Sequence, residues 1–422
     1  MREILRSFFK AGVGSGVNMV ISLIRIKVLA HYLGPQGVGL VSLLQQFQAT
    51  AQPIVTLGGD SPLVQGLASR SGFERSAFLA SAFSGLLISW SFCAVVIILG
   101  GSWFGKLLLS DFGTQQLGSF SLMAIPISAA ALAAFLISIL TTVGAVGTIQ
   151  KGQLIGNVGG LIAAIPLALF WHSGNLWLII AHLSVTPALT TVAAFWFAMK
   201  IPSSKEMLKS INFSSFNLLL LRRFLAFGGV TILTGFVTTA TWLVIRREVG
   251  RAEGLEALGY FSSTVMLSGI PLSLLSTALS SFYLPRFAAA TGAERPRLLK
   301  SVLLIVLPLA ACAFLTMQIM PEIIVKLLFS ERFLPMVPLL RWWAAGDFAR
   351  AISYVFAIPI FAAAHLRFAL ISELAFSGLL LGCVLFQPIG SRHTFGLGQI
   401  YFINYVLYLA TVILFARNKR YV

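Results

Sequence analysis

The sequence predicts an all-α integral membrane protein with about twelve transmembrane helices. Hydrophobic residues make up 58% of the 422 positions, charged residues make up 10%, and the mean hydropathy is +0.91. Soluble domains carry about 25% charged residues. Apolar runs of about 20 residues, the length that crosses a bilayer, recur along the whole chain with short connections, which leaves no room for a soluble domain. The first run is too long for a signal peptide, and no small-residue cleavage site follows it.

The apolar runs predict helices over 7–30, 36–59, 76–99, 117–141, 151–171, 175–199, 221–246, 257–284, 298–320, 338–363, 366–387 and 394–416. The longest polar interval between runs is about Lys200 to Leu220. It divides the chain into an N-terminal lobe of six helices (1–200), a cytoplasmic linker (201–220) and a C-terminal lobe of six helices (221–422).

A weak internal match supports two related halves. Lys27 precedes Val38–Leu40 by the same distance that Arg247 precedes Leu258–Tyr260, an offset of 220 residues. Six helices in each half give both halves the same orientation, so the repeats are parallel. Transporters built from such halves move one half against the other around a site near the midplane.

The basic residues are distributed in the way that sets membrane topology. Nineteen of the 30 Lys and Arg residues fall at the predicted inner ends of helices, and seven fall at the outer ends. Cytoplasmic loops carry this excess of positive charge, so both termini are predicted to be cytoplasmic. The net charge of +17 therefore does not indicate a nucleic-acid partner.

No catalytic or metal site is predicted. Cys93, Cys312 and Cys383 stand alone in apolar runs, and the five histidines are scattered without the spacing of metal ligands. No nucleophilic triad can be assembled. We expect neither an enzyme nor a cofactor, although proton or sodium coupling remains an expectation.

The first helix has a polar face. Ser15, Asn18, Ser22 and Arg25 follow one another at steps of 3, 4 and 3, which places them on one side of a helix. An arginine inside a membrane span costs about 2.5–3.5 kcal/mol, so it usually faces a bundle interior or a watery cavity. We predict that Arg25 and Asn18 bind substrate in a cavity. Alternatively, Arg25 snorkels to the outer surface or pairs with a neighbouring helix.

The second helix carries an amide stripe. Gln45, Gln48 and Gln52 are spaced i, i+3 and i+7. Because each amide offers donors and an acceptor, the stripe suits a ligand rich in hydroxyls, such as a sugar. Interhelical hydrogen bonding explains the same pattern equally well.

The second half holds charges at membrane depth. Asp347 and Glu373 are candidates for proton or sodium coupling, and Arg350 is a candidate for substrate binding. Asp347 and Arg350 are also i, i+3 neighbours, so a structural ion pair is the alternative. Arg246 and Arg247 end the helix over 221–246, where snorkelling to the outer surface explains them plainly. They point about 100° apart, so at most one of them, taken to be Arg246, faces a cavity.

Short motifs spread over the chain resemble those of a known family. They are Lys27–Ala30, Leu33–Pro35, Gly37–Gly39, Tyr283–Pro285, Leu327–Leu328, Arg332–Phe333, Gly346–Asp347, Tyr354–Phe356, Leu366–Phe368 and Glu373. In this order they resemble the Wzx-type bacterial polysaccharide flippases, which include the O-antigen and enterobacterial-common-antigen (lipid III) translocases. The common-antigen flippases look most similar.

The resemblance implies the multidrug/oligosaccharidyl-lipid/polysaccharide exporter (MOP) superfamily, with two six-helix lobes in a V. It implies a bacterial inner-membrane flippase that moves an undecaprenyl-diphosphate-linked oligosaccharide, a lipid III or O-antigen unit, from the cytoplasmic to the periplasmic leaflet by alternating access. A polysaccharide polymerase and a chain-length regulator are the implied partners. Arg25, with Arg350 or Arg246, would then hold the diphosphate, and the glutamine stripe would accept sugar hydroxyls.

Three other functions compete with this one. One of them, a non-transporting scaffold, would have no need of buried charge. A cation-coupled multidrug exporter of the same superfamily (MATE-like) should line its cavity with acids, whereas the predicted membrane interior holds four bases, Arg25, Lys27, Arg341 and Arg350, against Asp347 and Glu373. A membrane-embedded polymerase would carry a large periplasmic loop, and the predicted outer loops are short.

Overall fold

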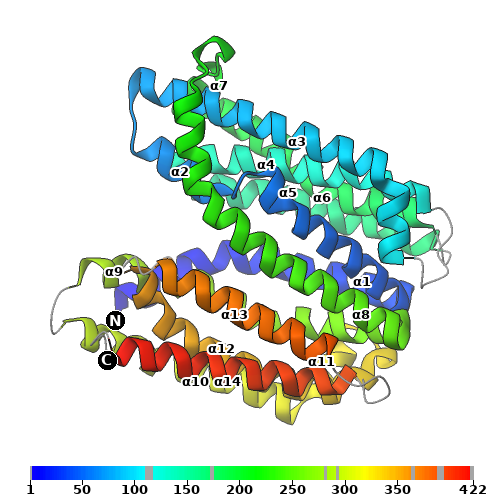
Figure 1. Ribbon diagram of the computed structural model, residues 1–422. Coiled ribbons are helices and arrows are strands. Elements are labelled where there is room, and N and C mark those ends of the chain that lie inside the picture. Colours follow the sequence, from blue (N-terminus) through cyan, green and yellow to red (C-terminus); the bar gives the residue numbers. More distant parts are fainter. Residues whose placement is uncertain are drawn as a thin grey trace. The chain divides into compact units, whose positions relative to one another are not determined.

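The described part of the chain is built almost entirely of helices. The computed structural model describes residues 2–109, 117–171, 175–279, 283–290, 294–362, 366–386 and 394–418, and within these ranges every regular element is helical (Figure 1). Eight helices of the described chain are long and apolar enough to span a bilayer. The chain is therefore a multi-pass membrane protein, as the sequence predicts.

The first half of the chain contains α1 (Arg2–Val55), α2 (Asp60–Ala68), α3 (Gly72–Leu109), η2 (Leu117–Met123), α4 (Ala124–Thr142), α5 (Val146–Leu169), α6 (Leu176–Lys200), α7 (Pro202–Lys209) and η3 (Phe213–Ser215). The second half contains α8 (Leu218–Ala278), α9 (Leu284–Ala289), α10 (Glu294–Ile319), α11 (Pro321–Leu328), η5 (Glu331–Met336), α12 (Val337–Ala362), α13 (Leu366–Leu385) and α14 (Thr394–Asn418).

Two of the long helices are interrupted at glycines. Gly34 in α1 has φ of 65° and Gly254 in α8 has φ of 88°, a region that only glycine enters at little cost. Each of these elements is therefore two helices joined at a sharp bend. Counted in this way, the described chain contains twelve long helices, which confirms the predicted fold class. The two glycines are 220 positions apart, the offset of the internal sequence match.

The chain forms two compact units. The N-terminal unit comprises Val17–Leu33 and Val41–Leu243, and the C-terminal unit comprises Met1–Gly16, Gly34–Leu40 and Val244–Val422. The predicted linker at 201–220 contains α7, η3 and the start of α8. The division into lobes at 1–200 and 221–422 stays a prediction.

In the N-terminal unit, α5 lies directly against α6 because glycines line the contact. A Cβ on Gly156 would overlap the Thr190 hydroxyl, and a Cβ on Gly160 would overlap the Thr186 hydroxyl and lie 2.8 Å from Arg25 Nη1. An apolar core of this unit joins α2, α3, α4 and α6, with residues such as Leu79 and Ile139 fully buried. Close packing at these glycines sets the distance between α1, α5 and α6.

The C-terminal unit is centred on α12 and α14, which pack along most of their length. Gly346 of α12 receives the ring of Tyr401, and Gly398 of α14 lies against Trp342. A second apolar core, which includes Tyr283, Val355 and Val412, joins the end of α8 with α9, α10, α12 and α14.

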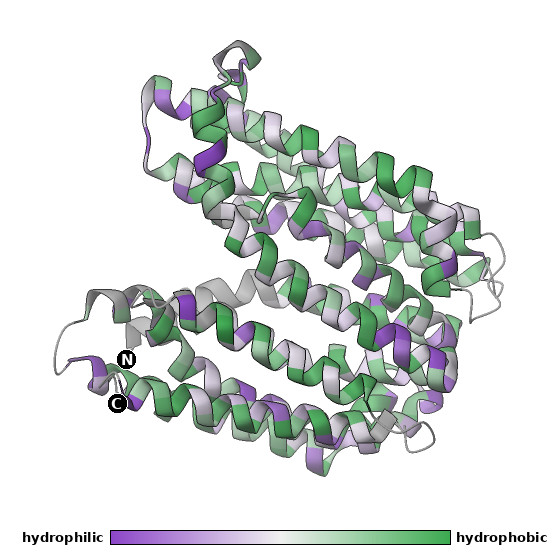
Figure 2. Cartoon of the chain, in the orientation of Figure 1, coloured by the Kyte–Doolittle hydropathy of each residue, from purple (hydrophilic) through white to green (hydrophobic). Residues whose placement is uncertain are grey.

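Hydrophobic residues predominate along the helices, as the colouring by residue hydropathy in Figure 2 shows, and many large apolar side chains are exposed. Leu99 is 81% exposed and Ile319 is 74% exposed. Surfaces of this kind are suited to contact with lipid. Of the basic residues behind the topology prediction, Arg392, Lys419 and Arg420 lie outside the described residues.

Candidate functional site

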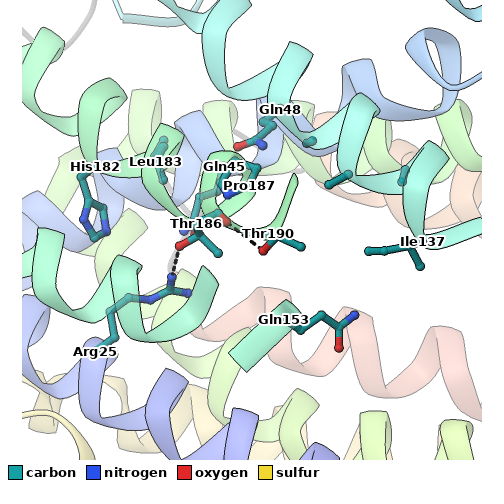
Figure 3. A pocket seen from close by; sticks show the side chains of 13 residues that line it. Arg25, Gln45, Gln48, Ile137, Gln153, His182, Leu183, Thr186, Pro187 and Thr190 are labelled. Carbon is teal, nitrogen blue, oxygen red and sulfur yellow. Dashed lines mark hydrogen bonds between the residues drawn. The ribbon is translucent and has the colours of Figure 1, made fainter. Parts of the chain in front are cut away.

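A pocket of about 370 Å³ lies within the N-terminal unit (Figure 3). Thirteen residues line it, and the polar ones come from α1, α5 and α6: Arg25, Gln45, Gln48, Gln153, His182, Thr186 and Thr190. Ile137, Leu183, Pro187 and three alanines of α4 complete the wall. No acidic residue is among these described lining residues.

Arg25 crosses from α1 to α6. Its Nη1 donates a hydrogen bond to the Thr186 hydroxyl at 3.0 Å, and Gly160 of α5 leaves room for the guanidinium (Figure 3). Among the described residues Arg25 forms no ion pair. Because a guanidinium has five N–H donors, most of its donor capacity and all of its charge remain available at the pocket.

His182, Thr186 and Thr190 lie at intervals of four residues and share one face of α6. The Thr190 hydroxyl donates to the backbone carbonyl of Thr186 at 2.8 Å. His182 is buried, and its imidazole interacts with both the Ala163 carbonyl of α5 and the charge of Arg25. The sequence analysis missed these residues and Gln153; the i, i+4, i+8 spacing on α6 is the signal that indicates them.

Two of the three predicted glutamines line the pocket. Gln45 and Gln48 both face it, and Gln48 Nε2 also donates to the Pro126 carbonyl of α4 at 3.2 Å. Gln52 is not among the lining residues, and its Oε1 is buried without a hydrogen-bond partner in the described chain. Gln45 and Gln48 therefore reach the pocket, whereas Gln52 does not. Gln48 also makes an interhelical hydrogen bond, which was the alternative interpretation of the stripe.

Asn18 lies outside the lining and connects α1 to α5. It donates to the Gln150 carbonyl at 3.4 Å, and its Oδ1 accepts a hydrogen bond from Asn157 Nδ2 at 3.1 Å. These bonds hold the polar face of α1 against α5 and so support the position of Arg25. Substrate binding by Asn18 and Gln52 stays a prediction.

Arg350 lies in the C-terminal unit among tyrosines. Its Nη1 donates to Tyr401 Oη at 3.3 Å, and its guanidinium lies 5.1 Å from the ring centre of Tyr405 and 5.6 Å from that of Tyr354. Tyr401 in turn donates to Asp347 Oδ1. Within the described chain, the Asp347–Arg350 pair is thus connected through a phenol rather than by a direct ion pair.

Asp347 retains a buried oxygen for another partner. Its Oδ2 is buried without a hydrogen-bond partner among described residues, and Ser268 of α8 lies next to the carboxylate. Glu373 of α13 lies near Tyr405 and Tyr408. The tyrosines at 401, 405 and 408 share one face of α14, a pattern that the sequence analysis did not use.

Arg246 lies in the C-terminal unit beside a small group of ion pairs. Arg247 Nη1 and Arg251 Nη2 each lie 2.8 Å from a carboxylate oxygen of Glu248. Arg246 is not among the residues that line the pocket of the N-terminal unit. The structure therefore brings Arg25, Gln45 and Gln48 together in one unit, while Arg246, Asp347, Arg350 and Glu373 belong to the other.

Comparisons of sequence identify a family and two curated relatives. The family described as polysaccharide biosynthesis protein matches residues 4–291. Proteins named lipid III flippase from Escherichia coli (strain K12) and Shigella flexneri are each 24% identical over 259 residues, which cover 60% of this chain. The match spans 60% of the length of these curated relatives.

Comparisons of structure agree on the fold. The lipid II flippase MurJ in an inward closed conformation has a TM-score of 0.74 at 15% identity, covering 97% of this chain and 87% of that one. An inward-facing multidrug resistance MATE transporter of the MOP superfamily has a TM-score of 0.71 at 14% identity, covering 97% and 98%. The relatives are flippases and transporters rather than catalytic enzymes, in line with the prediction that this chain is not an enzyme. The predicted resemblance is confirmed: the chain belongs to the polysaccharide biosynthesis protein family and has the fold of MOP-superfamily transporters.

Proposed function

We propose that this protein is a flippase that moves an undecaprenyl-diphosphate-linked oligosaccharide, a lipid III or O-antigen unit, from the cytoplasmic to the periplasmic leaflet of a bacterial inner membrane by alternating access. Both termini are cytoplasmic in this proposal. The names of the two lipid III flippases and the family description support the class of substrate. A polysaccharide polymerase and a chain-length regulator would act on the delivered product.

The observation that carries the proposal is the state of Arg25. Its guanidinium lies at a pocket, bonded to Thr186, with no ion pair in the described chain. A positive charge inside a membrane span is expensive unless something balances it. A diphosphate carries about two negative charges and must exchange its water for donors and cations when it enters such a span. The diphosphate would thus balance the charge of Arg25, and Arg25 would provide the donors and the positive charge that the diphosphate needs.

The remaining polar lining suits the sugars. Gln45, Gln48 and Gln153 offer amide donors and acceptors beside the arginine. Amides and hydroxyls can pair with a sugar hydroxyl in either direction. The apolar polyprenyl chain needs no polar site and would remain in the lipid during transport.

A cation-coupled multidrug exporter is the second candidate, because the MATE transporter fold covers 97% of the chain. Its cationic substrates would need acids in the pocket. The described lining has Arg25 and no Asp or Glu, so its charge favours an anionic substrate over a cationic one.

Resetting the carrier requires an energy source, and Asp347 and Glu373 are the proposed coupling acids. Exit of an anion toward the periplasm is favoured by an inside-negative potential by about 2.3 kcal/mol per charge per 100 mV. Oδ2 of Asp347 has no hydrogen-bond partner among the described residues, and binding of a proton or sodium ion there would alter the bond from Tyr401 to Asp347 and, through it, the position of Arg350. Arg350 and Arg246 are proposed as further anchors for the diphosphate.

Complementation tests the function directly. The gene is expressed in strains that each lack one defined glycan-lipid flippase, and surface glycan is measured. We expect surface glycan to be restored in a strain whose missing flippase carries a polyprenyl-diphosphate oligosaccharide. Arg25→Gln should lower the restored export at least tenfold, since removing hydrogen bonds to a charged group costs about 1.5–3 kcal/mol. Lys27→Gln is the matched control, because Lys27 is exposed on the same helix and does not line the pocket. Equal export by Arg25→Gln and wild-type protein at matched expression would refute the assignment.

A further inference from the structure

His182 is held in one orientation by its neighbours. The side chain is 4% exposed, and its imidazole hydrogen-bonds to the Ala163 carbonyl. Nδ1 of His182 has no hydrogen-bond partner among the described residues, so the bond to the carbonyl uses Nε2. A carbonyl oxygen can only accept, so Nε2 carries the proton. In a neutral imidazole the other nitrogen, Nδ1, is then an acceptor.

This acceptor is buried at the pocket with nothing to bind in the described chain. His182 is one of the lining residues, and Nδ1 has no hydrogen-bond partner there. Buried polar atoms are nearly always hydrogen-bonded, so a lone acceptor at a cavity indicates a donor supplied by a ligand. A proton on Nδ1 would instead place a second positive charge beside Arg25 within the membrane span, where one is already costly.

The pocket therefore presents two opposite chemistries next to each other. Arg25 offers N–H donors and a positive charge, which select an anionic oxygen. His182 Nδ1 selects an O–H or N–H donor and gains nothing from a phosphate oxygen. In Figure 3, Arg25 and His182 lie at the same end of the pocket, with Ile137 at the other end.

We infer that His182 accepts a hydrogen bond from a hydroxyl or amide N–H on the sugar attached directly to the diphosphate, while Arg25 holds the adjacent phosphate. The inference rests on the proposed function and adds a specificity determinant to the same site. Through His182 the carrier distinguishes a polyprenyl diphosphate that bears a sugar from one that bears none. Arg25 alone cannot make this distinction because both lipids carry the phosphate.

Binding to two lipids tests the inference. The full-length protein in lipid nanodiscs is titrated with undecaprenyl diphosphate and with the same lipid carrying one N-acetylhexosamine. Wild-type protein is expected to prefer the sugar-bearing lipid. His182→Leu should bind the sugar-bearing lipid about tenfold more weakly, the loss of one well-placed hydrogen bond, and the sugar-free lipid as before. Arg25→Gln should weaken binding of both.

Two further variants complete the design. His182→Asn places an amide oxygen near the position of Nδ1 without a charge and should restore most of the preference, whereas the exposed His31→Leu should leave binding of both lipids unchanged. Unchanged binding of the sugar-free lipid shows that a His182 variant is folded. Equal loss for both lipids, or no loss, in His182→Leu would overturn the inference while leaving the flippase proposal intact. Failure of the wild-type protein to bind either lipid would overturn both.

Discussion

Arg25 and Arg350 are the same residue type inside membrane helices, yet their surroundings differ. Arg25 has one hydrogen bond within the described chain, to the Thr186 hydroxyl, and it opens onto a pocket. Arg350 is bonded to Tyr401, lies over two further aromatic rings and is connected through Tyr401 to the Asp347 carboxylate. The first arginine has capacity left for a ligand, and the second is largely satisfied by its own unit. We therefore expect stability to depend more on Arg350, and transport to depend more on Arg25.

The largest expected effect on stability is at Arg350. Arg350→Ala should destabilise the protein by about 3–5 kcal/mol, because it leaves the Asp347 charge and the Tyr401 phenol buried without their cation. A thermal unfolding scan in detergent measures this as a large fall in Tm. Arg25→Ala is the comparison and should lower Tm much less, since this substitution removes a single hydrogen bond, the one from Arg25 to Thr186. Equal falls in Tm would show that the two environments are energetically alike.

A smaller effect is expected at Tyr401, which connects the two charges of the C-terminal unit. Tyr401→Phe retains the ring, which stacks on Trp343 at a centroid distance of 3.9 Å, but removes the hydroxyl between Arg350 and Asp347. Leaving a buried acceptor without its donor costs about 1–3 kcal/mol. If Asp347 also takes part in coupling, the variant should change the dependence of transport on proton or sodium gradients in proteoliposomes. Tyr32→Phe, at an exposed position of α1 in the N-terminal unit, is the control.

The sequence indicates the charged residues of both regions but not their partners. Arg25 and Arg350 stand out because charge is rare in apolar helices. Thr186 and Thr190 do not, because a threonine in a membrane helix can satisfy its own hydroxyl on the preceding turn, as Thr190 does on the Thr186 carbonyl. Which face of α6 meets another helix depends on contacts between residues far apart in sequence. Here Gly160 of α5 leaves the space that lets Thr186 of α6 approach Arg25.

The fold is easier to predict than the partners of the charged residues, since each membrane span is indicated by a continuous run of about twenty apolar residues. Most long helices of the first half end within a few residues of the predicted positions, but α3 continues to Leu109, beyond the predicted end at 99. The bend between the first two helices falls at Gly34, within the motif Leu33–Pro35. The packing of the helices against one another is harder to predict from the sequence. The tyrosines of α14 point to Arg350 only once α12 and α14 are known to pack at Gly346.

Thr186→Val probes the one contact that orients Arg25. The substitution keeps nearly the same volume and the positive charge but removes the hydroxyl that accepts from Nη1. We expect transport in proteoliposomes to show a several-fold rise in KM, in keeping with about 1 kcal/mol for a hydrogen bond, and little change in Tm. Thr191→Val, whose hydroxyl bonds to backbone carbonyls and does not line the pocket, is the control. A KM unaffected by Thr186→Val would mean that Arg25 needs no orientation from α6.

The smallest expected effects distinguish two amides of one stripe. Gln48→Leu removes a polar group that lines the pocket and donates to the Pro126 carbonyl, so binding of a sugar-bearing lipid should weaken by about two- to fivefold, corresponding to about 0.5–1 kcal/mol. Gln52→Leu should weaken binding less than Gln48→Leu does, because Gln52 lies outside the pocket. It should leave Tm unchanged or slightly higher, because the buried Oε1 of Gln52 lacks a partner in the described chain. If Gln52→Leu instead weakened binding as much as Gln48→Leu, the ligand would extend along the whole stripe, beyond the pocket that surrounds Arg25.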